Sequence, residues 1–224
     1  IPLYFISCAL EEDETIDKAS NLPTKGMVVS AHPIASAIGY EILKSGGNAF
    51  DAAVGVQFAL SVVYPRAGNI AGGGFAVFRT KEGEAGTLDY REKAPLASGK
   101  DMYLDEAKNV VPGLSSFGIL AVGVPGTVDG MIKLHEKYGH LPFEDLLQPA
   151  IDLAKNGFAL TKNEAKKLNQ YRDAFIKAND SSFVLIHPTE WRTGDILILE
   201  NLAETLIRIQ KQRRAGFYSG LTAQ

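Results

Sequence analysis

The segment that most constrains the fold is NAFDAAVGVQFALSVVYP, residues 48–65, which is apolar nearly all the way round. A helix that is hydrophobic on every side must be enclosed by other elements. Asp51 lies near the start of this segment, where the helix dipole favours a carboxylate, and Pro65 lies just past its end. We therefore expect a central helix that is buried on most of its sides.

The residues before this helix predict a strand and a second helix. Residues 27–31, MVVSA, form a short apolar run typical of a buried strand. A helix should begin at Pro33 and end at the Gly46-Gly47 pair, which supplies the positive φ of a helix stop. The apolar positions of this helix share one face: Ile34, Ile38 and Ile42.

The pattern then changes to period two, which indicates extended chain. Apolar residues alternate through residues 75–79, the turn residues KEGEAG follow, and GTLDYRE resumes the extended pattern. These residues are interpreted as a β-hairpin.

Two helical segments are expected next. Thr127 should cap a helix that runs through His135 and that Gly139 ends. Residues 142–157, PFEDLLQPAIDLAKNG, should form a second helical segment that Pro149 interrupts or restarts.

The last third of the chain predicts more helix. Thr161 and Glu164 form a capping box that opens TKNEAKKLNQYRDAFIKA, and residues 200–212 have a helical pattern. No repeat or linker divides residues 27–224, so no internal domain boundary is expected. The chain stops at GFYSGLTAQ without a closing element, which suggests one piece of a larger protein.

Composition excludes several classes of protein. With a net charge of −3 and 46% hydrophobic residues, the chain has a sizeable core but no basic face for nucleic acid. Cys8 is the single cysteine, and the four histidines lack metal-ligand spacing. Neither a metal nor a cofactor is expected.

Residues 1–26 are interpreted as a leader or a disordered N-terminus, outside the folded part. The apolar start could be the end of a secretory signal, and FISC is similar to a bacterial lipobox in which Cys8 would be acylated. An ordinary disordered terminus is the alternative. With the first interpretation, the protein would be periplasmic or otherwise exported.

The glycine run AGGGF does not have the spacing of a phosphate-binding loop. It lacks GxxxxGK[ST], and Gly72, Gly73 and Gly74 lead into a strand instead of a helix. Residues without Cβ are better explained by a backbone that passes closely against the buried helix before the hairpin.

Several long segments, taken together and in order, resemble one family. They are SAHPIASAIGYEILKSGGNAFDAAV, YPRAGNIAGGGFAVFR, LDYREKAP and AVGVPGTVDGM, with PAIDLAKNGF and AGFYSG further on. The chain resembles the N-terminal part of the large subunit of γ-glutamyltransferase (γ-glutamyltranspeptidase), from about Gly26 to its end.

The resemblance implies an α/β (α+β) fold, the αββα sandwich of the N-terminal nucleophile hydrolases, which would be incomplete in this chain. It also implies a precursor that cuts itself into large and small subunits. The threonine that begins the small subunit would attack the γ-glutamyl amide of glutathione or related compounds. Water or an acceptor amine would then resolve the acyl-enzyme.

This sequence departs from the family pattern at the nucleophile. The family's cleavage site has adjacent threonines followed by histidine, and this chain contains no Thr-Thr pair. We therefore assign no catalytic residue here, and the chain alone should be inactive. The small subunit would be the partner that carries the threonine.

One family role falls on a residue of this chain. Arg91 in YREKAP matches the arginine that binds the α-carboxylate of the γ-glutamyl group in the family. The residues alone leave two interpretations open, because Arg91 could instead form a solvated charge pair with Glu92 or with Asp89. On an extended strand, Asp89 and Arg91 point to one face and Tyr90 to the other.

Other polar residues are assigned to structure. His32 is expected to cap or pack at a helix start, and His135 and His187 are expected to be structural too. Tyr90 is expected in the core.

Two rival functions remain. A cephalosporin (glutaryl-type) acylase of the same family would use the same arginine for a glutaryl group. A non-catalytic γ-glutamyl-binding protein would keep the arginine without the nucleophile.

Overall fold

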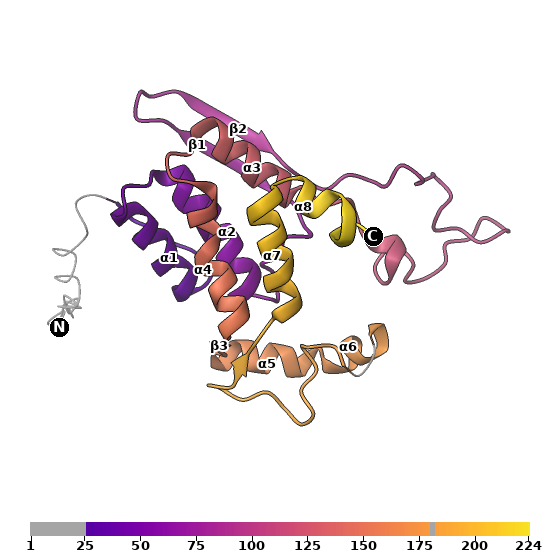
Figure 1. The fold of residues 1–224 in the computed structure, drawn as a ribbon. Helices are drawn as coiled ribbons and strands as arrows, with labels where there is room; N and C mark the ends of the chain where they lie inside the picture. Colours follow the sequence, from indigo (N-terminus) through magenta and orange to yellow (C-terminus); the bar gives the residue numbers. More distant parts are fainter. Residues whose placement is uncertain (1–25, 180–181) are drawn as a thin grey trace, which may run out of the picture.

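The computed structural model describes residues 26–179 and 182–224 and combines helices with short strands in an α+β fold (Figure 1). The predictions for the N-terminal leader, including Cys8, lie outside the described residues. No helix in the described part of the chain is long and apolar enough to cross a lipid bilayer.

Five helices of the described part of the chain contribute most of the core. They are α1 (Pro33–Lys44), α2 (Ala49–Val63), α3 (Thr127–Tyr138), α4 (Phe143–Asn156) and α7 (Glu200–Gln212). Helix α2 packs against both α1 and α4, and α4 packs against α7 (Figure 1). Val54, Phe58, Val62 and Val63 of α2 are fully buried. The prediction of a central, enclosed helix is confirmed.

The starts of α1 and α2 are capped by side chains. His32 Nδ1 accepts a hydrogen bond from the Ile34 amide at 3.2 Å, so His32 caps α1 as predicted. Asn48 and Asp51 form a capping box on α2. The buried Asp51 carboxylate also accepts from the His140 amide at 2.9 Å, in the connection between α3 (Thr127–Tyr138) and α4. Asp51 therefore links α2 to the α3–α4 connection as well as capping α2.

The predicted hairpin is present. Strands β1 (Phe75–Arg79) and β2 (Ala85–Asp89) pair antiparallel, with Phe75 opposite Asp89. The inner face carries Phe78, which makes edge-to-face contacts with Phe50 and Tyr138. The outer face is exposed, so the hairpin covers the helices with one side only.

The cap predicted at Thr127 is wrong by one residue. Gly126 occupies the N-cap of α3, and no side chain of the described residues caps this helix. Instead, the Gly72 carbonyl accepts from the amides of Gly126 and Thr127 at 2.9 and 3.0 Å. The glycine run thereby replaces a capping side chain. The end of the helix at Gly139 is confirmed.

Two other local predictions are wrong. Residues 27–31 form no strand, and Met27 and Val29 are 61% and 82% exposed, because no neighbouring strand pairs with them in the described structure. Helix α4 runs without interruption through Pro149. Pro149 has no amide hydrogen to donate to the carbonyl of Asp145, an exposed residue, so the helix loses one hydrogen bond. The buried residues on either side of Pro149 keep the helix in the core.

The remaining elements lie around this core. The capping box of Thr161 and Glu164 is confirmed at the start of α5 (Lys162–Gln170), but the chain turns at Tyr171 into a separate helix, α6 (Arg172–Ala178). The short elements are β3 (Phe158–Ala159), which pairs with β4 (Ile196–Leu197), and α8 (Ala215–Tyr218), η3 (Ile119–Ala121) and η4 (Gly220–Thr222).

A long segment, residues 94–122, projects from the helices and is drawn in pink in Figure 1. An isolated bridge between Lys93 and Val124 closes its base. The segment exposes large apolar side chains, namely Leu96, Val110, Phe117, Ile119, Leu120 and Val122.

Candidate functional site

Arg91 lies two residues beyond β2, at the open end of the hairpin. Its side chain is 60% exposed, whereas Tyr90 is half-buried against the core. The predicted alternation of the two faces is therefore confirmed, and Arg91 stays accessible at the surface.

Arg91 is held by its neighbours in the sequence. Its amide donates to Asp89 Oδ1 at 2.9 Å, and its Nε donates to Glu92 Oε2 at 2.9 Å. The guanidinium lies over the Phe75 ring, 5.7 Å from the centroid. The pair with Glu92 considered from the sequence is thus present, and it occupies the Nε side of the guanidinium.

The pKa of the Glu92 carboxyl is lowered. Hydrogen bonding to its own backbone is the main cause, followed by the hydrogen bond from Arg91, and the Gly73 amide contributes further. Glu92 is therefore ionised at neutral pH and keeps the Arg91 side chain in its orientation.

The glycine run shapes the backbone beneath Arg91. A Cβ on Gly73 would lie 2.6 Å from the Tyr90 carbonyl oxygen, 2.7 Å from the Glu92 nitrogen and 2.8 Å from Arg91 Cα. A Cβ on Gly74 would similarly contact the Tyr90 ring. The glycine backbone packs closely against other chain, as predicted. The predicted packing partner is wrong, because Gly73 and Gly74 pass against residues 90–92 and not against the buried helix.

A cavity of about 220 Å³ opens beside Arg91. Residues from β2, the N-terminal end of α3 and α8 line it, so three segments distant in sequence meet there. Its charged lining residues are Asp89, Arg91, Lys93, Asp129, Lys133 and Arg214. With four cations and two carboxylates, the cavity favours an anionic ligand.

The C-terminal end of the chain supports this cavity. Tyr218 donates to the Pro125 carbonyl at 2.8 Å and accepts from the Asp129 amide at 3.3 Å. Asp129 pairs with Lys133 at 2.9 Å and with Arg214. Burial by itself would raise the pKa of Asp129, but the hydrogen bonds from these two cations outweigh it and lower that pKa.

Sequence reasoning missed Asp129, Lys133, Arg214 and Tyr218 as neighbours of Arg91. Tyr218 belongs to AGFYSG, which carries part of the resemblance, but its position 127 residues after Arg91 hides the contact. Only the packing of α8 against the start of α3 brings these residues together.

The remaining sequence predictions concern structural residues. Tyr90 packs against the core as expected, and burial raises the pKa of its phenol. His135 contacts the Leu141 carbonyl at 2.8 Å, and His187 lies beside Trp191. None of the three predicted structural histidines lines the Arg91 cavity.

No cluster of three or more His, Cys, Asp or Glu side chains suited to a metal ion occurs among residues 26–179 and 182–224.

Comparison with known proteins identifies one family. Residues 35–224 match the family model described as gamma-glutamyltranspeptidase. A glutathione hydrolase proenzyme from Pseudomonas sp. (strain A14) is 46% identical over 97% of this chain, which spans 38% of that protein. The glutathione hydrolase proenzyme of Escherichia coli (strain K12) is 39% identical over 89% of the chain, which spans 35% of it.

Solved structures agree with these relatives. The γ-glutamyltranspeptidase of Helicobacter pylori matches with a TM-score of 0.87 and 46% identity, covering 90% of this chain and 58% of that one. A cephalosporin acylase from Bacillus halodurans matches with a TM-score of 0.75 and 27% identity, covering 90% of this chain and 40% of that one. The chain thus spans little more than a third of the curated relatives' length.

Proposed function

Because this chain belongs to the γ-glutamyltranspeptidase family, we propose that it is the N-terminal part of the large subunit of an enzyme that cleaves γ-glutamyl amides. Glutathione is the proposed substrate, since the relatives with 46% and 39% identity are named glutathione hydrolase proenzymes. The precursor would cut itself, and the small subunit would be the partner of this chain.

The proposed chemistry divides between the two subunits. The hydroxyl of the small subunit's N-terminal threonine attacks the γ-glutamyl carbonyl, and its α-amine takes the proton. The resulting α-ammonium returns this proton to the amide nitrogen, so the C–N bond breaks, the leaving group departs as an amine and an ester acyl-enzyme remains. Water or an acceptor amine then attacks this ester and releases the threonine. The present chain contributes substrate binding.

Arg91 is proposed to bind the α-carboxylate of the γ-glutamyl group. The observation that carries this role is an exposed guanidinium at the rim of a cationic cavity, oriented by Glu92 and carried on a backbone that packs closely against Gly73. With Nε bonded to Glu92, the edge formed by the two terminal amino groups is left for a carboxylate. Two parallel charge-assisted bonds match that group, whereas lysine offers a point charge.

Replacing Arg91 by lysine tests this role in the complete two-subunit enzyme. R91K should raise the KM for a γ-glutamyl donor by about tenfold or more, because a charge-assisted bond is worth about 1.5 to 3 kcal/mol. Self-cleavage should continue, because Arg91 is proposed to bind the donor and takes no part in the chemistry of the threonine. Subunit formation on a denaturing gel and donor kinetics measure the two effects.

Arg79→Lys is the matched control, because Arg79 is an exposed arginine on the same hairpin and lies outside the Arg91 cavity. It should leave the donor KM within about twofold of the parent enzyme. An unchanged donor KM in R91K, or an equal rise in both variants, would contradict the assignment.

The αββα sandwich is also a proposal. The outer face of the hairpin exposes Phe75 and Val77, 63% and 83% of whose surfaces are accessible. A second sheet from the rest of the polypeptide packed on this face would bury them, as sheet-on-sheet packing requires. A structure of the complete protein with another element on this face would contradict the sandwich.

The rival functions can be separated by assay. A cephalosporin acylase should hydrolyse a glutaryl amide faster than a γ-glutamyl anilide, and the reverse is expected here because the relatives named above are closer in sequence. A non-catalytic binding protein would lack a Thr-Thr-His pattern downstream of residue 224. Export, with Cys8 as a point of acylation, stays a prediction that cell fractionation and the mass of the mature N-terminus would test.

A further inference from the structure

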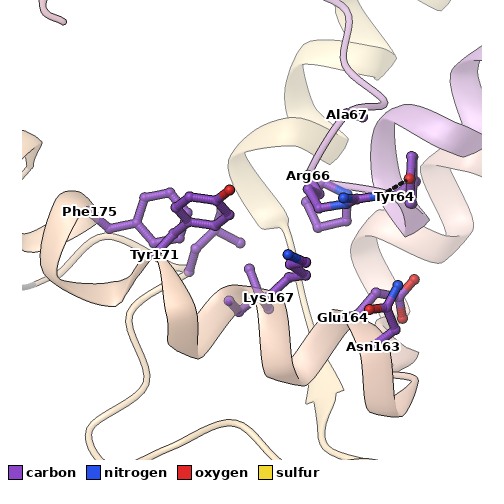
Figure 2. A pocket seen from close by; sticks show the side chains of 11 residues that line it. Tyr64, Arg66, Ala67, Asn163, Glu164, Lys167, Tyr171 and Phe175 are labelled. Atoms are coloured by element: carbon purple, nitrogen blue, oxygen red, sulfur yellow. Dashed lines mark hydrogen bonds between the residues drawn. The ribbon is translucent and has the colours of Figure 1, made fainter.

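A second cavity, of about 510 Å³, lies between the loop that follows α2 and the helices α5 and α6 (Figure 2). Its volume lies within the range of about 300 to 1,000 Å³ that small-molecule sites occupy. It shares no lining residue with the Arg91 cavity. A ligand here would therefore be distinct from the γ-glutamyl group.

Two cations face this cavity without an acidic partner. Arg66 and Lys167 line it, and within the described part of the chain neither forms an ion pair. Both are positioned by neutral groups, since Arg66 donates to the Tyr64 hydroxyl and Lys167 Nζ donates to Gln170 Oε1 at 2.9 Å. Figure 2 shows the Lys167 ammonium directed into the space between Tyr171 and Arg66.

The one carboxylate in the cavity wall is already engaged. Glu164 is buried, its Oε1 lies 3.0 Å from His32 Nε2, and its Oε2 accepts from the Thr161 amide at 2.8 Å. Both oxygens of the Glu164 carboxylate therefore have other partners, and two cations face one carboxylate among the lining residues. The mouth of the cavity therefore has a net positive charge.

The rest of the wall is apolar. Leu168 is buried beneath the cavity, and Leu185 and Phe175 are partly buried beside it. In Figure 2, Tyr171 and Phe175 both lie on the side of the cavity away from Arg66. An apolar body could thus contact these rings while an anionic group reaches the two cations.

We propose that this cavity binds a small organic anion made of one carboxylate and an apolar body about the size of an aromatic ring. The carboxylate would lie between Arg66 and Lys167, where both can donate charge-assisted hydrogen bonds. The ring would pack against Tyr171, Phe175 and Leu168. The proposal depends on the charges and walls of this cavity and is independent of the γ-glutamyl activity.

Calorimetric titration of the full-length protein with 3-phenylpropionate tests the site. Binding should weaken about tenfold or more for 3-phenylpropionamide, which keeps the ring and loses the charge, and similarly for propionate, which keeps the charge and loses the ring. Raising the salt concentration should weaken the binding of 3-phenylpropionate and leave the binding of 3-phenylpropionamide unaffected. Absence of 3-phenylpropionate binding at millimolar concentration, or equal binding of the acid and the amide, would overturn the proposal.

Variants locate the binding within the cavity. Lys167→Met keeps most of the side-chain length and removes the charge, so it should weaken the binding of 3-phenylpropionate about tenfold. Arg66→Gln should weaken this binding as well. Lys166→Met is the matched control, because Lys166 is the adjacent exposed lysine of α5 and does not line the cavity. Equal losses in K167M and K166M would place the binding elsewhere and overturn the assignment.

Discussion

The helical core and the hairpin contain the same kinds of apolar side chain, but the core buries them and the outer face of the hairpin exposes them. In the core, Phe58 and Phe143 are fully buried and meet edge to face, with ring centroids 6.0 Å apart. On the hairpin, Phe75 and Val77 face outward and are mostly exposed. The core is closed by its own residues, whereas the hairpin leaves one face uncovered.

The difference teaches where stability and binding are located. Burial of large apolar residues among α1, α2, α3, α4 and α7 stabilises the chain. The hairpin holds Arg91 at its open end through glycine contacts and hydrogen bonds. These contacts fix the position of the Arg91 side chain and bury little apolar surface. Three substitutions, each with a matched control, measure this contrast.

The largest effect is expected from Phe58→Ala. Removing a fully buried ring from the core should lower the free energy of unfolding by about 3 to 5 kcal/mol. In this chain by itself, where no second sheet covers Phe75, the same change at Phe75 should cost about 0.5 kcal/mol or less. Urea unfolding of both variants measures the difference, and similar losses would show that the two regions share one tightly packed core.

An intermediate effect is expected from Gly73→Ala. The added Cβ would press against three backbone atoms of residues 90–92, which should lower the free energy of unfolding by about 1 to 3 kcal/mol. In the complete enzyme it should also raise the donor KM, because Arg91 Cα must move.

Gly99→Ala is the control for Gly73→Ala, since a Cβ there would meet nothing within 4 Å. Its stability should stay within about 0.5 kcal/mol of the parent or rise slightly. If G73A were as stable as G99A and kept the donor KM, the glycine run would not position Arg91.

The smallest effect is expected from Tyr218→Phe. The change removes the hydroxyl that joins α8 to Pro125 and to the Asp129 amide, and it should cost about 1 kcal/mol. Tyr103→Phe removes a similar bond, to the Leu120 carbonyl at 3.0 Å, in an exposed loop. It should cost less than about 0.5 kcal/mol, and a larger loss than in Y218F would contradict the supporting role of α8.

Features that depend on neighbouring residues could be predicted well from the sequence. The apolar segment that became α2, the capping box of Thr161 and Glu164 and the hairpin are read from periodicity and cap chemistry. Arg91 was found through the resemblance of YREKAP to a family motif, since periodicity alone left it as a surface charge. Its contact with Glu92 is local and was also foreseen.

Features that depend on distant residues were missed or assigned wrongly. Residues 27–31 have the composition of a strand, yet no partner strand lies beside them in the described structure. Pro149 should break a helix, yet α4 continues because the buried residues around it outweigh one lost hydrogen bond. Competition of this kind between local preference and packing has no signature in a single sequence.

The sequence by itself determined the central helix, the hairpin, the caps of α1 and α5, and the family. Each of these features depends on residues that are close together or on long motifs. Tertiary structure alone decided what the glycine run packs against and which residues surround Arg91. It also placed Arg66 and Lys167, which are 101 positions apart in the sequence, in the wall of one cavity. The physical reason is that side-chain periodicity encodes which face of an element is buried, whereas the partner of that face is chosen by packing of the whole chain.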